Sequence, residues 1–350
     1  MNRYPHILGC LLGTALGDAV GLRREGLSRR RAERMYGGTP LGPDFILGLG
    51  FCSDDAEHTQ MVGRALVLSA GHVAKFEKEL SRQLKRWLVA LPAGIGLATL
   101  RACIKLLLGF GPKRSGVFSA GNGPAMRTAL IGVWAESDDQ LKELVRICTR
   151  LTHTDPRAEE GALLVAKAAR LTASGQYVEP TEFLRDAVGE VEGEELRESL
   201  QMAIKALAAN KAPKEFADSL GWSEGVTGYV NHSVPAALYC WADSPNDFRR
   251  CVENAVLLGG DTDSVAAIAG AICGANVGSE NLPPDWLISL AEWPRSKSWM
   301  RQLAEALSNE AKVCELPKPP GMRWLATVPR NFVFAAIVLV IGFRRLLPPY

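Results

Sequence analysis

The sequence lacks the features that mark a secreted, a zinc-binding or a nucleic-acid-binding protein. Its eight cysteines stand singly, with neither the close pairs of a zinc site nor the density of a disulfide-rich scaffold. The 40 Lys and Arg residues are balanced by 38 Asp and Glu, so a surface built mainly to neutralise nucleic-acid phosphates is excluded. We therefore predict a protein of the reducing cytoplasm that binds no nucleic acid and whose anion sites are local.

Strand patterns are also scarce. Runs of β-branched residues alternating with polar ones are almost absent, and no fixed-period repeat of a solenoid recurs. Helix-length blocks of Ala, Leu and Val recur instead, for example at residues 139–151 and 158–171. With 350 residues and 47% hydrophobic composition, the chain can bury a large core without disulfides. We predict an all-α bundle.

No uninterrupted apolar run reaches membrane-spanning length. The N-terminal apolar run at 7–20 is interrupted by Asp18. Only six residues precede this run, which leaves no room for the apolar region of a signal peptide. We interpret this run as the first core helix of a domain at 1–312.

The C-terminal segment 324–350 differs in character and follows a Pro-rich linker at 313–323. Its apolar run of about 12 residues would form a helix of roughly 18 Å, against a hydrocarbon core of about 30 Å. Counting from Trp324 reaches spanning length but includes Pro329, Arg330 and Asn331. Two interpretations stay open: membrane association through 324–345, as an anchor or an interfacial helix, or a tail that packs on the domain or on another subunit.

Five acidic residues stand where a solvated surface is a poor explanation. They are Glu25, Asp54, Asp55, Asp261 and Asp263. The glutamate follows a run of small residues at 13–21, where glycines let another backbone approach closely. Each aspartate pair opens an apolar helical pattern, the first with Ser53 as a plausible N-cap.

Carboxylates in the first turn of a helix are favourable by roughly 0.3–1 kcal/mol, so each pair alone has a purely structural explanation. Both helical patterns, however, are too apolar to be exposed, so their N-termini should face the interior or a cleft. Two like charges about 4 Å apart cost on the order of 4 kcal/mol at an effective dielectric near 20. A bound cation removes that cost, and oxygen ligands select a hard ion such as Mg²⁺, Ca²⁺ or Mn²⁺.

Five motifs in this order resemble the ADP-ribosylglycohydrolase family between residues 5 and 305. They are the Gly-rich run ending in Gly21 and Glu25, Ser53-Asp54-Asp55, Gly121-Asn122-Gly123-Pro124-Ala125-Met126-Arg127, Thr152-His153, and Gly259-Gly260-Asp261-Thr262-Asp263-Ser264. The resemblance implies a compact orthogonal multi-helix bundle with an extra C-terminal helix. It also implies two Mg²⁺ or Mn²⁺ ions, bound by Glu25, Ser53, Asp54, Asp55, Asp261, Asp263 and Ser264. Ala56 departs from the Thr of many members, which removes a hydroxyl beside the metal ligands.

A second set of residues is expected to bind ADP-ribose. Glycines before a helix N-terminus can expose N–H groups to an anion, and Pro124 fits a first helical position. The resemblance assigns ligand contacts to Gly121, Asn122, Gly123, Met126, His153 and Tyr229. His153 is expected to begin another helix, with a capping or buried structural role as the alternative.

The activity implied by the resemblance is hydrolysis of the N- or O-glycosidic bond between ADP-ribose and an acceptor, either a protein or a small conjugate. Catalytic roles fall to Glu25, Asp54, Asp55 and Asp261. Two alternatives remain open: a two-metal phosphoesterase, and a binding or crystallin-like member of the family without turnover.

Overall fold

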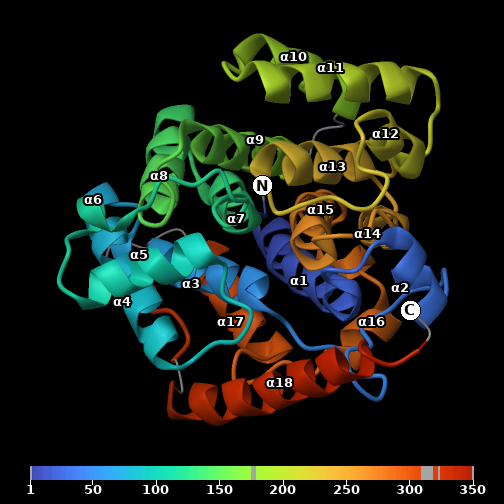
Figure 1. Ribbon diagram of the computed structural model, residues 1–350. Coiled ribbons are helices and arrows are strands. Elements are labelled where there is room, and N and C mark those ends of the chain that lie inside the picture. The colour runs from blue at the N-terminus through green and yellow to red at the C-terminus, as the bar shows by residue number, and fades with distance from the viewer. Residues whose placement is uncertain (1, 175–178, 309–317, 322–323, 349–350) are drawn as a thin grey trace.

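The protein is all-α, as predicted (Figure 1). The computed structural model describes residues 2–174, 179–308, 318–321 and 324–348. Within these residues the only β pairing is a set of isolated bridges. The helices are α1 (Tyr4–Gly21), η1 (Leu22–Arg24), α2 (Arg29–Tyr36), α3 (Asp54–Ser69), α4 (Val73–Val89), α5 (Leu97–Leu107), α6 (Pro112–Ser115), α7 (Ala125–Trp134), α8 (Asp138–Arg150), α9 (Pro156–Thr172), α10 (Pro180–Glu190), α11 (Glu194–Ala208), α12 (Pro213–Ser219), α13 (Val230–Asp243), α14 (Phe248–Leu257), α15 (Thr262–Val277), η2 (Ser279–Asn281), α16 (Pro284–Ser289), α17 (Lys297–Ser308) and α18 (Trp324–Arg344).

The centre of the fold is the pair α1 and α15, both buried along almost their whole length. Glycine recurs every fourth residue of α1 from Gly9 to Gly21, on the side that faces α15. A Cβ placed on Gly17 would lie 2.0 Å from the carbonyl oxygen of Ala266, and one on Gly21 would lie 2.4 Å from that of Thr262. The backbones of α1 and α15 are therefore in direct contact, as expected for a core helix. This contact also places Asp18, the acidic residue of α1, beside the start of α15.

We expect Gly17→Ala to destabilise the protein by about 3 kcal/mol, because the added methyl group must push two packed backbones apart. Gly189→Ala is the matched control. A Cβ at Gly189 meets nothing within 4 Å, and it lies in α10, so this change should be neutral or slightly stabilising. Denaturant unfolding measures both. If Gly17→Ala stayed within experimental error of the wild type, the close backbone contact would be wrong.

The predicted helices at 139–151 and 158–171 correspond to α8 and α9, with ends that differ by one to two residues. In Figure 1, α10 and α11 lie at the outside of the bundle. Both helices are rich in polar residues, and their outer faces are exposed.

The C-terminal segment forms α18, which runs along one side of the bundle (Figure 1). One face is buried against the domain through Thr327, Arg330, Asn331, Phe334 and Ile337. Residues 326–344 are long and apolar enough to cross a membrane, as are residues 4–24, but the latter are mostly buried in the core. Of the predicted linker only 318–321 lies within the described residues, so the domain boundary stays a prediction.

Candidate metal centre and substrate cleft

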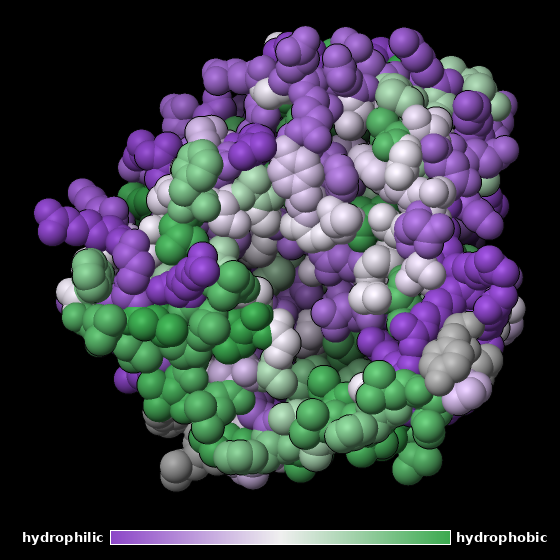
Figure 2. Space-filling view, in the orientation of Figure 1, coloured by the Kyte–Doolittle hydropathy of each residue, from purple (hydrophilic) through white to green (hydrophobic). Residues whose placement is uncertain are grey.

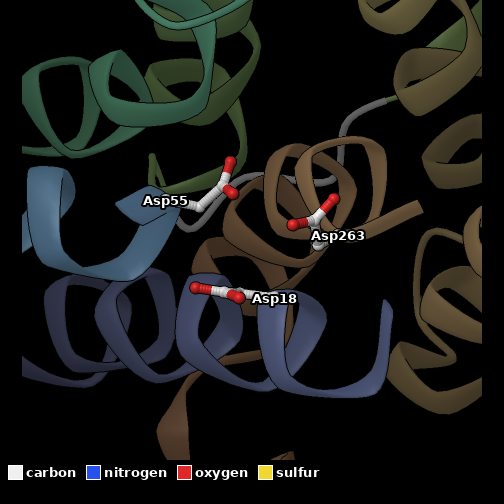
Figure 3. A group of neighbouring side chains, drawn as sticks. All are labelled: Asp18, Asp55 and Asp263. Atoms are coloured by element: carbon white, nitrogen blue, oxygen red, sulfur yellow. The ribbon is translucent and has the colours of Figure 1, made fainter. Parts of the chain in front are cut away.

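Three buried aspartates from three helices face a common space (Figure 3). Asp18 comes from α1, Asp55 from the first turn of α3 and Asp263 from the first turn of α15. One carboxylate oxygen of each lies within 4.8 Å of those of the other two. The two acidic motifs, more than 200 positions apart in sequence, therefore meet in space, and the glycine-mediated contact of α1 with α15 is what brings them together.

Asp18 holds the start of α3. Its carboxylate accepts hydrogen bonds from the backbone N–H of Ser53 at 2.8 and 2.9 Å and from that of Ala56 at 3.1 Å. Ser53 is the N-cap of α3, as predicted, and its hydroxyl donates to Oδ2 of Asp55 at 2.9 Å. The backbone at Ala56 thus keeps a hydrogen bond to the cluster although its side chain has no hydroxyl.

Two carboxylate oxygens in this cluster are buried without a hydrogen-bond partner, Oδ1 of Asp55 and Oδ1 of Asp263. A buried, unpaired carboxylate oxygen is costly unless a donor or a cation meets it. Because the oxygens of aspartate and serine are the available metal ligands, the site fits a hard divalent cation such as Mg²⁺ or Mn²⁺. These two oxygens are the observation on which we base that fit.

The other predicted carboxylates line an open cleft of about 350 Å³ next to the cluster. Glu25, Asp54 and Asp261 all border it, together with Asp263 and Ser264. Asp261 is oriented by Asn122, whose side-chain amide donates to its Oδ2 at 2.7 Å. Ser53 and Asp55 do not line the cleft, and they lie buried behind it.

The electrostatics of the centre favour neutralisation. Burial raises the pKa of Asp18 to about 8, although its backbone hydrogen bonds act in the opposite direction. Burial, followed by the negative charges of Glu25 and Asp55, raises the pKa of Asp263 well above its usual value. The residue Glu25 is largely exposed, but desolvation of its carboxylate and the charge of Asp261 raise its pKa, while Arg345 lowers it. Protons or cations must therefore compensate the cluster.

The loop 121–123 forms one wall of the cleft, and its glycines have a local packing reason. A Cβ on Gly121 would lie 3.2 Å from Nε2 of His153, and one on Gly123 would lie 3.1 Å from its Cε1. The N–H of Asn122 donates to the carbonyl of Gly228 at 2.9 Å, and that of Gly121 to the hydroxyl of Ser119 at 3.3 Å. Two of the N–H groups of this loop are thus used within the protein, and contact of the loop with an anion stays a prediction.

His153 borders the cleft but does not begin a helix, which corrects that expectation. The next helix, α9, starts at Pro156 with Asp155 as its N-cap, because proline suits a first helical position. The ring of His153 is buried, its Nδ1 lies 2.9 Å from the hydroxyl of Thr152, and burial lowers its pKa to about 3. It is therefore a neutral imidazole at physiological pH.

Tyr229 does not line the cleft, although the preceding residue, Gly228, does. Its backbone pairs with that of Gly121, and its hydroxyl donates to Glu195 and accepts from Arg157. Met126, by contrast, does line the cleft. Of the predicted ligand-binding residues, the structure therefore brings together Gly121, Asn122, Gly123, Met126 and His153, and leaves Tyr229 beside them.

Sequence reasoning missed two residues of this region. Asp18 was treated only as an interruption of an apolar run, although a lone carboxylate between Gly17 and Gly21 in a core helix signals a buried, partnered charge. Arg127 is also buried, and it donates to the carbonyl of Cys148 at 2.9 Å and the hydroxyl of Thr152 at 2.6 Å. It places a positive charge behind His153, where it lowers that pKa further.

A helical fold with buried carboxylates beside an open cleft defines a class, that of all-α proteins with a candidate divalent-metal site. Residues 1–316 match the model of the family described as ADP-ribosylglycohydrolase. The chain belongs to the ADP-ribosylglycohydrolase family.

Relatives span most of the chain. An uncharacterized protein of Archaeoglobus fulgidus is 31% identical, covering 85% of this chain and 94% of that protein. Human ADP-ribosylhydrolase ARH3 is 27% identical, covering 79% of this chain and 87% of that protein. The ADP-ribosyl-dinitrogen-reductase glycohydrolase of Rhodospirillum rubrum is 26% identical, covering 82% of this chain and 90% of that protein. A solved structure described as an ADP-ribosylglycohydrolase-related protein complex superposes with a TM-score of 0.67 at 28% identity, over 88% of this chain and 98% of that one. The predicted family and fold are confirmed.

The raised carboxyl pKa values predict a metal-dependent response of stability to pH. Groups with a folded pKa above the unfolded value near 3.9 bind more protons in the folded state, so stability falls as pH rises towards the folded pKa. For Asp18 that value is about 8. Below about pH 6.5, the buried histidines His58 and His153, with lowered pKa values, act in the opposite direction.

We therefore expect the unfolding temperature of the protein in EDTA to fall between about pH 6.5 and 8. With saturating Mg²⁺ or Mn²⁺ the fall should vanish, because the cation replaces the protons on the cluster. Thermal unfolding with and without metal measures this difference. A metal-induced shift that stays constant or shrinks as pH rises would show that the cation binds elsewhere.

Proposed function

We propose that the protein is a metal-dependent hydrolase that cleaves the N- or O-glycosidic bond between ADP-ribose and an acceptor, either a protein side chain or a small conjugate. The observation that carries the proposal is the convergence of the two aspartate motifs around two unpaired buried oxygens at the base of a cleft. Family membership and the printed activities of the relatives support the choice of ADP-ribose.

Two Mg²⁺ or Mn²⁺ ions would be held by Ser53, Asp54 and Asp55 on α3 and by Asp261, Asp263 and Ser264 on α15, with Glu25 at the mouth. When bound, these ions polarise a water molecule and the hydroxyls of the ribose next to the scissile bond. Asn122 fixes Asp261 through a 2.7 Å hydrogen bond, so that ligand is already oriented. Asp18 does the same for the start of α3.

The cleft offers room on two sides of the carboxylates. A second groove of about 420 Å³ shares Glu25, Gly228 and Asp261 with the first. We assign ADP-ribose to the first groove, where Met126 and the neutral His153 line the wall and Arg127 lies behind it. The acceptor then enters through the second. The scissile bond lies between them, at Glu25 and Asp261.

Hydrolysis places the hydroxyl of water on the anomeric carbon and a proton on the departing nitrogen or oxygen. Glu25 and Asp261 both border the two grooves, and burial raises the pKa of each carboxyl group. Asp261 already accepts a hydrogen bond from Asn122, whereas Glu25 is exposed, so Glu25 is the carboxyl group placed to exchange a proton with the acceptor. We assign it the proton transfer, and Asp54, Asp55 and Asp261 the positioning of the attacking water.

The proposal is tested by incubating the protein with arginine-linked and serine-linked ADP-ribosyl peptides and with small ADP-ribosyl conjugates, in Mg²⁺, Mn²⁺ or EDTA. Mass spectrometry should find free ADP-ribose and the unmodified acceptor only with metal. Release of inorganic phosphate would identify a phosphoesterase instead. Binding of ADP-ribose without turnover on any acceptor would identify a non-catalytic family member.

A further inference from the structure

The described surface carries an extended band of exposed apolar side chains. We define the apolar band as the exposed apolar residues of 89–110, in the region of α4 and α5, and of 332–347, on and just after α18. Figure 2 shows it as continuous green atoms along the lower left and the bottom of the molecule. On α18, Phe332, Leu339 and Phe343 are 61%, 62% and 68% exposed. Contiguous apolar patches of this kind mark interaction sites.

The two halves of the apolar band belong to one surface because their elements are bonded together. The side-chain amide of Asn331 in α18 donates to the carbonyl of Ala90, at the end of α4, at 2.8 Å. Ala93, in the loop between α4 and α5, packs against a small core that contains Phe334 and Ile337 of α18.

The charged residues within the two segments that carry the apolar band all have one sign. Residues 82–118 contain seven Lys and Arg, and residues 318–345 contain five more, so these two segments hold 12 of the 40 basic residues and none of the 38 acidic ones. Arg86, Arg101, Lys113, Arg114 and Arg344 are exposed. The rest of the chain has an acidic excess, so the molecule presents one apolar and basic side.

The inner face of α18 fixes how the helix can meet a partner. Arg330 donates to Glu292 at 2.6 Å and to the carbonyl of Cys52 at 2.6 Å, both buried. Arg345, past the other end, donates to the carbonyls of Glu25 and Arg23, each at 2.8 Å. A membrane-spanning orientation would break these bonds and place Arg330 in hydrocarbon. The helix can therefore only lie flat, with its apolar outer face presented.

We propose that the apolar band docks this protein on an anionic membrane surface, with α18 lying in the plane of the interface. Apolar side chains at acyl depth with arginine and lysine at the headgroups are the composition of an interfacial helix. A second copy of the chain fits less well, because facing bands would oppose basic residues with no acidic partner in either segment. Leu97 lies both on the band and on the cleft, so the cleft mouth would open beside the membrane. This inference does not depend on the proposed hydrolysis.

The test is flotation of the full-length protein with vesicles of phosphatidylcholine alone or with about one third phosphatidylglycerol. We expect binding to the anionic vesicles and little to the neutral ones. Leu339→Ser with Phe343→Ser should lower the partition coefficient about tenfold or more, because the apolar area that enters the membrane is lost. Both side chains are exposed, so the substitutions should not disturb the fold. Arg101→Glu with Arg114→Glu should lower the partition coefficient in the same way. Alkaline carbonate should release the bound protein.

Matched controls are Ile288→Ser, an exposed apolar residue on α16, and Lys142→Glu with Arg146→Glu, on α8. Both should bind as the wild type does, and all variants should keep the wild-type unfolding temperature. Absence of wild-type binding to anionic vesicles would overturn the proposal. Dimers in solution that dissociate in the Leu339→Ser, Phe343→Ser variant would also overturn it, because the apolar band would then bind a second copy. Resistance of the bound protein to carbonate would overturn it as well, because that would show a membrane-spanning helix.

Discussion

Asp263→Asn is expected to lower metal-dependent hydrolysis of ADP-ribosyl bonds by about 10³-fold while making the metal-free protein more stable. The buried carboxylate has an unpaired oxygen and four acidic neighbours, and we expect it to bind the metal, so the substitution removes a metal ligand. Loss of several kcal/mol of Lewis-acid stabilisation corresponds to about three powers of ten in rate. Without metal, the same change removes a charge that the folded state disfavours, which should raise the free energy of unfolding by on the order of 1 kcal/mol at pH 7.5.

Kinetic assays and chemical unfolding in EDTA measure the two effects. Asp186→Asn, on the exposed side of α10, is the matched control and should change neither. An Asp263→Asn protein that is less stable than the wild type in EDTA would show that the carboxylate is satisfied by the protein itself. Full activity in that variant would remove Asp263 from the metal site.

Arg330→Ala is expected to destabilise the protein by about 3–5 kcal/mol, because it leaves buried acidic partners without a cation. Arg330 donates to both oxygens of Glu292 and lies 3.8 Å from Oε1 of Glu57, all within the core. Its bond to the carbonyl of Cys52 also holds the residue before the Ser53 N-cap. The variant should therefore lose metal affinity along with stability. Arg344→Ala is the control on the same helix, since Arg344 is exposed and, within the described residues, donates to the nearby carbonyls of Leu347 and Pro348.

Urea unfolding and metal titration of the two variants measure these effects. Arg330→Met combined with Glu292→Gln should recover part of the lost stability, because both charges leave together. A loss below about 1 kcal/mol for Arg330→Ala would show that α18 is loosely attached, and it would also weaken the case for a helix fixed in the plane of a membrane.

Much of the helical framework could be predicted because it depends on local patterns. The small-residue runs at 13–21 and 265–275 predicted buried helices, and the structure places them against each other, glycine to backbone. The N-cap at Ser53 and the helices at 139–151 and 158–171 follow from capping chemistry and hydrophobic periodicity, which need no knowledge of the tertiary fold. The resemblance of five motifs to a known family then predicted that the remote aspartates form one site.

The remainder depended on three-dimensional neighbours. Asp18 is recognised as part of the centre only when its backbone hydrogen bonds to Ser53 and Ala56 are seen. The N–H groups of the loop at 121–123 looked free in sequence, but residues 119 and 228 accept from two of them. His153 was placed at a helix start because the pattern does not show that Asp155 and Pro156 cap the helix instead.

The C-terminal helix shows the same limit. Its composition left a membrane anchor and a packed tail open, and Pro329, Arg330 and Asn331 counted only as faults in a spanning segment. In the structure, Arg330 and Asn331 are the residues that bind α18 to the domain. Their partners, Cys52, Glu292 and Ala90, are distant in sequence, so no local pattern could reveal them.

The central claim is that the aspartates of α3 and α15 share hard divalent cations beside Asp18, and anomalous scattering from crystals grown with Mn²⁺ tests it most directly. We predict two peaks at the carboxylates of α3 and α15, both lost in Asp263→Asn crystals. A map with no peak at the cluster, or with Mn²⁺ only at surface carboxylates, would contradict the account.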